Sequence, residues 1–317
     1  MTDPVDPGID RAPQPKPAQS YGAAVDAKSE IREFLTSRRD RITPEHAGLP
    51  TFGTGPRRVK GLRREEVALL AGVSVDYYTR LERGNLSGAS ETVLEAIARA
   101  LQLDDTERSH LFDLARATHA APMRRRRRSP RQVRPSVQQM LDAMAGVPAF
   151  VRNSRLDILA ANTLGHALYS QHFDSPAQPP NTARFVFLDE RSKSFYLDWD
   201  RVAGDAVAIL RAEAGRDPYD RDLSDLVGEL STRSELFRTL WATHNVYRHD
   251  AGTKRFHHPI VGELNVNWEA MELVADPGLT MFVYTAEPGS KSEQALNLLA
   301  SWTATPVQSQ AARSADR

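Results

Sequence analysis

The sequence has no cysteine among its 317 residues. A chain without thiols has no disulfide framework and no thiolate chemistry, which fits a reducing compartment. It also lacks any apolar run approaching the ~18 residues that a membrane-spanning helix needs. Residues 1–28 are polar and proline-rich and lack the apolar segment of a signal peptide, so we interpret 1–28 as a disordered tail. Together these absences predict a cytoplasmic protein with no membrane partner.

Catalytic and metal-binding patterns are missing as well. The sequence contains no H-E-x-x-H, G-x-S-x-G or Walker A motif, and its nine histidines are scattered. His257 and His258 are adjacent on a predicted strand, so their side chains should point to opposite faces. We therefore expect no catalytic residues, no metal site, no cofactor and no enzyme activity.

The net charge is zero, but the charges are unevenly spread. Residues 1–134 hold 24 Lys and Arg against 18 Asp and Glu, and the remainder holds 17 against 23. Only 6 of the 23 aromatic residues precede residue 135. A basic first half suggests contact with a polyanion, whereas the aromatic second half suits a substantial core or a pocket.

The stretch Leu62–Gly84 predicts two short helices joined by a tight turn. Gly72 stands where the first helix needs a residue with φ > 0, and Ser74 is a good N-cap for the second helix. Tyr78 and Leu81 should face inward, three residues apart on one side of that helix. A helix that stops, turns and restarts within three residues, with a polar and basic outer face, predicts a helix-turn-helix motif. An ordinary corner between two helices is the alternative.

Three further helices, at 29–41, 91–101 and 105–118, should complete a five-helix domain over 29–121. Five positive charges lie within 57–64, where the first helix of such a motif crosses the DNA backbone. A solvated charged face is the alternative interpretation. The predicted DNA-binding residues are Arg57, Arg58, Lys60, Arg63, Arg64, Ser74, Val75, Asp76, Tyr77, Thr79, Arg80 and Arg83.

This stretch resembles the xenobiotic-response-element (XRE) class of helix-turn-helix regulators. The matching residues are Glu65, Glu66, Ala68, Gly72, Val73, Ser74, Glu82 and Gly84. The resemblance implies a partner, double-stranded operator DNA, a nucleoid-associated location, and a homodimer that reads two half-sites. Arg64 departs from the pattern, since the family usually has a DNA-contacting Gln there; an Arg would favour a phosphate or guanine contact.

An arginine-rich segment, 122–135, separates the two halves of the chain. It contains Arg124–Arg128 in succession, and such a block of like charges should not pack. We interpret it as a linker with little capacity to transmit force. On that view, a signal from the second half would act by moving two DNA-binding domains of a dimer relative to each other.

The second half, 136–303, predicts an α+β domain. It should begin with a helix at 136–145 and a hairpin over 148–161. Helices should follow at 162–171, 192–199, 201–214, 222–230 and 234–243, then strands at 254–258, 260–274 and 279–285, and a last helix at 292–303. Residues 304–317 are interpreted as a disordered tail. Five mainly antiparallel strands with helices on one face are the plan of PAS-type sensor domains.

The second half resembles the MmyB-like ligand-binding domain. The segments that carry the resemblance include PAFVRN, LDILAAN, ARFVFLD, YLDWDRVA and KRFHHPIVGELNV. The family usually has Trp at the position of Ala161, and losing that indole could enlarge a cavity. The resemblance implies a multidomain regulator: an all-α five-helix XRE-type domain followed by an α+β PAS-like domain that binds a fatty-acid-like ligand.

Aromatic residues and a few polar residues within apolar segments are the candidate ligand contacts, because buried polar groups need partners. The predicted ligand-binding residues are Phe150, Asn162, Arg184, Phe187, Trp241, His244 and His257. Plain core packing is the alternative for each aromatic residue. Two alternatives for the whole domain also stay open: it only dimerises, or it is an enzyme domain fused to a DNA-binding domain.

Overall fold

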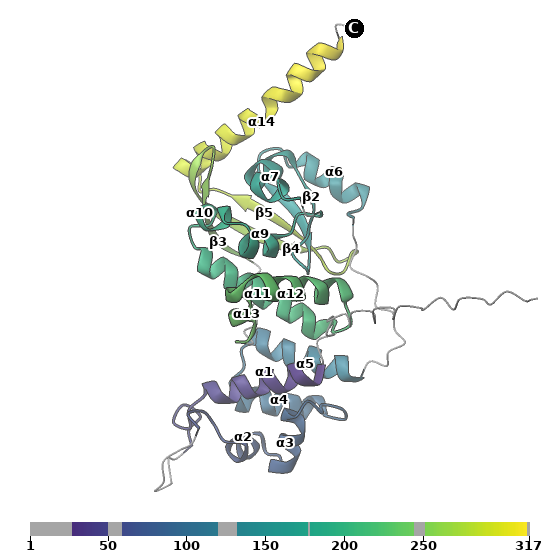
Figure 1. The fold of residues 1–317 in the computed structure, drawn as a ribbon, viewed down its shortest axis with the longest axis vertical. Helices are drawn as coiled ribbons and strands as arrows, with labels where there is room; N and C mark the ends of the chain where they lie inside the picture. The colour runs from purple at the N-terminus through teal and green to yellow at the C-terminus, as the bar shows by residue number, and fades with distance from the viewer. Residues whose placement is uncertain (1–26, 50–58, 120–131, 177, 244–250, 316–317) are drawn as a thin grey trace, which may run out of the picture.

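The computed structural model describes residues 27–49, 59–119, 132–176, 178–243 and 251–315. These residues form a helical N-terminal domain and a larger C-terminal domain that contains one sheet (Figure 1). The predictions for Arg57, Arg58, the Arg124–Arg128 block, His244, residues 1–26 of the N-terminal tail and residues 316–317 fall outside the described residues.

Five helices make the N-terminal domain, as the sequence predicts. They are α1 (Ala27–Arg41), α2 (Arg64–Ala71), α3 (Val75–Glu82), α4 (Glu91–Ala100) and α5 (Asp105–His119). Gly72 ends α2 with φ 66°, and the Ser74 side chain accepts a hydrogen bond from the Tyr77 N–H at the start of α3. Tyr78 and Leu81 are fully buried. The turn and cap signals in the sequence therefore specify the two helices of the motif.

The C-terminal domain is α+β. Its strands are β1 (Ala149–Asn153), β2 (Ile158–Ala161), β3 (Ala251–His258), β4 (Gly262–Glu272) and β5 (Leu279–Thr285). Its helices are α6 (Pro135–Ala143), α7 (Thr163–Leu168), α8 (Ser170–Phe173), α9 (Thr182–Leu188), α10 (Arg191–Phe195), α11 (Trp199–Arg216), α12 (Arg221–Arg233), α13 (Glu235–Trp241) and α14 (Lys291–Ala315).

The five strands pair antiparallel in the order β2-β1-β5-β4-β3. Alternating side chains divide the sheet into two faces. On the inner face Phe150, Phe282 and Tyr284 pack beneath α7, α9, α10, α11 and α14. On the outer face, α6 covers the β1 and β5 side. The sheet therefore matches the predicted plan, with α6 as an addition on the second face.

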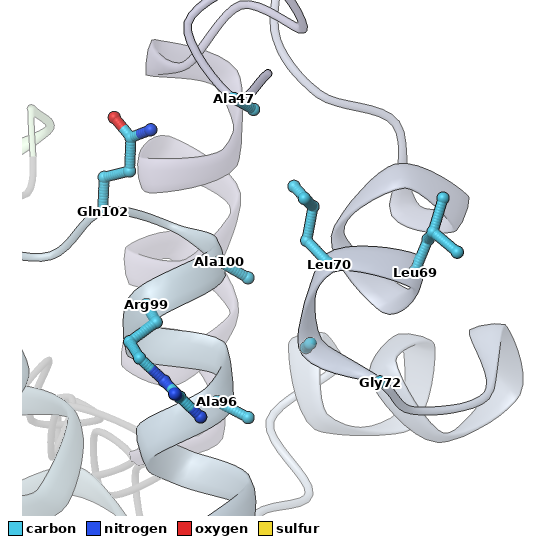
Figure 2. Close-up of a pocket in the computed structure, with 9 residues that line it drawn as sticks. Ala47, Leu69, Leu70, Gly72, Ala96, Arg99, Ala100 and Gln102 are labelled. Carbon is cyan, nitrogen blue, oxygen red and sulfur yellow. The ribbon is translucent and has the colours of Figure 1, made fainter. Parts of the chain in front are cut away.

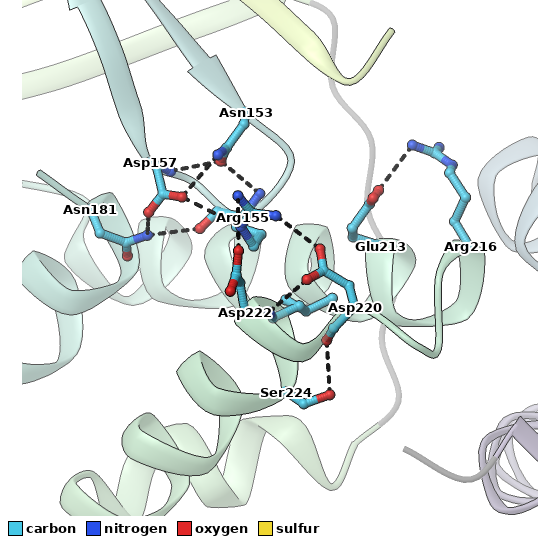
Figure 3. A network of polar contacts seen from close by, with 10 residues as sticks. Asn153, Arg155, Asp157, Asn181, Glu213, Arg216, Asp220, Asp222 and Ser224 are labelled. Atoms are coloured by element: carbon cyan, nitrogen blue, oxygen red, sulfur yellow. Dashed lines mark hydrogen bonds and ion pairs between the residues drawn. The ribbon is translucent and has the colours of Figure 1, made fainter. Parts of the chain in front are cut away.

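A buried polar network fixes the β1–β2 hairpin against the helical layer (Figure 3). Arg155 is 5% exposed and forms ion pairs with Asp220 at 2.9 Å and Asp157 at 3.5 Å. Asn181, which caps α9, donates to the Asp157 carboxylate at 2.7 Å. The hairpin, α9 and the start of α12 are thus held in one arrangement.

The two domains contact each other directly through α11. Arg211 of α11 is 1% exposed and pairs with Glu30 of α1, its Nη1 lying 2.5 and 2.7 Å from the two carboxylate oxygens. Arg216 lies 3.7 Å from Asp113 of α5, and Ala212 packs against the N-terminal core. The two domains are therefore connected by direct packing as well as by the chain, because three positions on one face of α11 meet α1 and α5.

Three local predictions need correction. Helix α9 lies where the sequence predicted no element, and the helix expected at 162–171 is divided into α7 and α8 at Tyr169. Helix α14 continues to Ala315, past the expected helix end at 303 and into the segment 304–317 that was expected to be disordered. Figure 1 shows α14 projecting away from the sheet.

Candidate functional site

Helix α3 presents a polar and basic face to solvent. Ser74, Val75, Asp76, Arg80 and Arg83 are exposed, and Val75 is 45% exposed. Tyr77 and Thr79, also predicted to bind DNA, are partly exposed. The Arg80 guanidinium stacks over the Tyr77 ring at 4.9 Å, which limits its rotamers. Figure 1 places α2 and α3 at the end of the molecule opposite α14, so this face is accessible to a long rod-shaped partner.

The basic residues before α2 divide into two groups. Lys60 and Arg63 are exposed, and the Arg63 backbone N–H donates to Glu66 at 2.6 Å, which caps the helix. Arg64, by contrast, donates to the buried Glu82 while its side chain stays 51% exposed. Arg39 of α1 also binds Glu82, at 2.8 Å. Arg64 therefore has a structural partner, in addition to any contact with DNA.

Glu82 of α3 joins both helices of the motif to α1. Burial opposes its charged form, but hydrogen bonds from Arg64 and Arg39 outweigh that effect and hold the pKa of Glu82 below its ordinary value. Because α1, α2 and α3 each contribute one member of this cluster, their relative positions are fixed by it.

A hollow of about 380 Å³ lies beside the motif, between α2 and α4 (Figure 2). Leu69 and Leu70 line it from α2, and Ala96 and Arg99 line it from α4. It is not on the exposed face of α3, so it is separate from the predicted DNA contacts.

The predicted ligand-binding residues do not converge. Phe150 lies on the inner face of the sheet, whereas Arg184 pairs with Glu229 at 2.8 Å in the helical layer. Phe187 and Trp241 both pack on Phe237, at 5.1 and 5.5 Å between ring centres, towards the N-terminal domain.

Neither Asn162 nor His257 contributes a free polar group to the interior of the domain. The Asn162 amide accepts from Ala149 and Gly165 and donates to the carbonyls of Met144 and Val147. Those four bonds use its whole hydrogen-bonding capacity, so none remains for a ligand. His257 is exposed on the outer face, while His258 is buried and contacts the Ala167 carbonyl. The two histidines thus point to opposite faces, as predicted.

The inner face of the sheet carries polar groups among aromatic rings. The hydroxyls of Tyr169 and Tyr284 lie 2.7 Å apart, and His172 Nε2 lies 2.9 Å from the Tyr196 hydroxyl. Burial raises the pKa of Tyr284 to about 12 and lowers the pKa of His172 well below its ordinary value. These groups are therefore neutral near pH 7 and act there as hydrogen-bonding groups.

Two basic side chains, Arg152 of β1 and Lys254 of β3, share this face. The Arg152 guanidinium lies 4.2 Å from the centre of the Phe282 ring, and the Lys254 ammonium lies 5.5 Å from that of Tyr196. Neither residue was among the ligand contacts predicted from the sequence, although the spacing along each strand could have indicated them. Arg152 follows Phe150 by two residues and Lys254 precedes Phe256 by two, so each shares a strand face with a large aromatic residue.

The described residues hold no cluster of three or more His, Cys, Asp or Glu that could bind a metal ion. None of the helices in that part of the chain is long and apolar enough to span a membrane.

An N-terminal helix-turn-helix with an accessible second helix, followed by an α+β domain with polar groups inside, defines a DNA-binding transcription regulator with a ligand-binding domain. Comparison with known families agrees: residues 30–111 match a helix-turn-helix domain, and residues 133–299 match the MmyB-like transcription regulator ligand binding domain. The chain belongs to this MmyB-like family of regulators. No curated protein matches it.

Proposed function

We propose that this regulator changes its affinity for operator DNA when its C-terminal domain binds an amphipathic, fatty-acid-like molecule. The observation that carries the proposal is the buried contact between α11 and the N-terminal domain. A ligand affects DNA binding only if it binds the DNA-competent and DNA-incompetent states unequally. Two domains in contact through buried charges offer such states, because separating them exposes Glu30 and Arg211 to water.

The DNA-binding half of the proposal rests on α3. Its exposed residues lie where a recognition helix enters the major groove, and Lys60 and Arg63 lie where the preceding segment crosses the phosphate backbone. A homodimer would place two such helices about 34–36 Å apart, one turn of DNA. A protein with this target shares the compartment of the chromosome, so we place it in the cytoplasm with the nucleoid.

Helix α11 supports coupling between the two halves. Near its N-terminal end, Arg201 donates to the Thr253 carbonyl of β3 at 2.7 Å. Near its C-terminal end, Arg211 pairs with Glu30, and α1 continues to Arg39, which holds Glu82 at the end of α3. Helix α11 thus contacts β3, which borders the interior of the ligand-binding domain. It also contacts α1, which supports the recognition helix α3.

Reciprocal binding tests the proposal. DNA selected from a random pool by the full-length protein serves as the operator, and decanoate is titrated with and without that DNA. A coupling of about 1–3 kcal/mol would change both affinities by the same factor of about 5–150. Equal decanoate affinities in the two titrations would contradict the sensor hypothesis and favour a C-terminal domain that only dimerises. Turnover of a bound compound would favour the enzyme alternative.

A further inference from the structure

Helix α1 is in close backbone contact with both helices of the motif. In its first turn it meets Gly84, which follows α3: a Cβ added to Gly84 would lie 2.4 Å from the Lys28 carbonyl oxygen. In its last turn it meets Gly61, which precedes α2: a Cβ added to Gly61 would lie 2.4 Å from the Asp40 Cα. Contacts this close leave α1 little room to slide against either helix. The motif should therefore move with α1 as one body.

Buried polar contacts along α1 fix the same arrangement. Thr36 donates a hydrogen bond to Glu82 of α3 at 3.2 Å. Arg39 donates to Glu82 at 2.8 Å and to the Leu62 carbonyl, just before α2, at 2.7 Å. Glu82 is 1% exposed, so these bonds are shielded from water and are stronger for it. Any change in the position of α1 is thus also a change in the position of α3.

Arg211 of α11 holds α1 from the C-terminal domain. Its Nη1 lies 2.5 and 2.7 Å from the two carboxylate oxygens of Glu30, in the turn of α1 that meets Gly84. Its Nη2 donates to the Trp241 carbonyl of α13, and its guanidinium stacks on the Trp241 ring at 4.1 Å. Arg211 is therefore fixed within its own domain and reaches the other domain with charge-assisted hydrogen bonds.

A second charged contact between the domains is weaker. Arg216 lies 3.7 Å from Asp113, and its side chain is 39% exposed. Ion pairs open to solvent contribute little to stability. Glu30 and Arg211 are only 3% and 1% exposed, so removing either one leaves its partner as an uncompensated buried charge. Loss of this ion pair should therefore separate the domains.

We propose that the ion pair between Glu30 and Arg211 determines which spacing of operator half-sites the dimer accepts, by fixing each recognition helix relative to the C-terminal domains that join the two copies. The proposal rests on the homodimer proposed above. Arg211 is a positioning residue in this scheme, since it is buried between the domains and acts on α3 through α1. Helix α11 occupies surfaces of α1 and α5 in each copy, which favours a dimer joined through its C-terminal domains.

The geometry of DNA makes this constraint measurable. Each base pair added between two half-sites moves one of them by about 3.4 Å and rotates it by about 35° around the helix axis. A dimer with fixed DNA-binding domains cannot follow that change. A dimer whose DNA-binding domains are attached only through the chain can follow it, but the effective concentration of its second domain at the native spacing is lower. Loss of the ion pair should therefore weaken binding at the native spacing and flatten the dependence on spacing.

The test measures binding of the full-length protein to three DNAs by fluorescence anisotropy: the selected operator, that operator with two base pairs inserted between its half-sites, and a single half-site. We expect the insertion to cost the wild type about tenfold or more in affinity. Arg211→Gln and Glu30→Gln should each lose about tenfold on the selected operator and less than about threefold more on the insertion. Both should bind the single half-site as the wild type does. Arg211→Lys keeps a charged donor for Glu30 and should retain the wild-type preference for spacing.

The matched control is Arg233→Gln. Arg233 pairs with Glu229 at 2.9 Å within α12 and is 59% exposed, so its replacement removes the same charge away from the interface and should change none of the three affinities. Interface variants that keep the wild-type loss on insertion would overturn the proposal. Loss of single half-site binding would also overturn it, because the ion pair would then maintain α3 itself. Equal affinity of the wild type for the operator and the single half-site would overturn the homodimer as well.

Discussion

Replacing Gly215 by alanine should open the interface between the two domains. Gly215 is buried near the end of α11, where α11 crosses α5. An alanine Cβ there would lie 2.3 Å from His110 Cε1 and 2.8 Å from His110 Nδ1. His110 is 3% exposed and stacks edge-on against Phe34 at 4.9 Å, so it has no room to move aside.

The expected cost is that of overpacking a core, about 1–3 kcal/mol. Gly204 of the same helix is the control, because a Cβ added there meets no atom within 4 Å. Gly204→Ala should stabilise the helix by about 1 kcal/mol through backbone entropy alone. In a domain of this size 1 kcal/mol shifts the melting temperature by about 2–4 °C, which scanning calorimetry resolves.

The two variants should therefore shift the melting temperature in opposite directions. Gly215→Ala should also split a joint unfolding transition into two, because the domains then unfold independently. If both variants raise the melting temperature and neither changes the number of unfolding transitions seen in the wild type, the domains do not pack through α11 in solution, and the coupling proposed here loses its basis.

Three further changes test other parts of the structure. Tyr78→Phe should be neutral or stabilising, since the buried Tyr78 hydroxyl has no hydrogen-bond partner among the described residues, whereas Tyr78→Ala should cost about 3–5 kcal/mol in circular dichroism melts. Arg80→Ala should relax base preference at one operator position, as measured by repeating the DNA selection; uniform weakening would assign Arg80 to a phosphate, and no effect would remove it from the interface. Burial lowers the pKa of His110 to about 4 in the folded protein. An unfolded histidine takes up its proton near pH 6.5, so stability should fall between pH 6.5 and 4 by up to about 3 kcal/mol, and a His110→Gln variant should lose that part of the pH dependence in urea titrations.

The sequence predicts the helix-turn-helix well because its signals are local. Gly72 and Ser74 act on the residues beside them, so their roles follow from position alone. Arg38 and Arg39 show the limit of local reasoning. They stand at the end of α1, where they favour the helix dipole, yet both are buried against Glu107 and Glu82. Those partners are distant in sequence, and only the fold brings them together.

The candidate ligand site was predicted less well for a related reason. Asn162 is polar within an apolar segment, which suggests a ligand, but the backbone of the same chain uses all of its donors and acceptors. The sequence cannot distinguish a polar group that the fold satisfies from one that it leaves for a ligand. Arg152 and Lys254 lie among the aromatic rings of the inner face, and recognising that they share this face required the register of the sheet.

The ion pair between Glu30 and Arg211 suits a switch better than a permanent joint. A buried pair contributes little more stability than a well-packed apolar contact, whereas a charge left buried without its partner costs about 3–5 kcal/mol. The interface is therefore stable when closed or when open and hydrated, and unfavourable in between. A ligand that favours one position of α11 need only supply the difference in free energy between those two states. Coupling between two sites is typically about 1–3 kcal/mol. For this reason the charged linker need not transmit any force: the signal has a shorter route through α11 and α1.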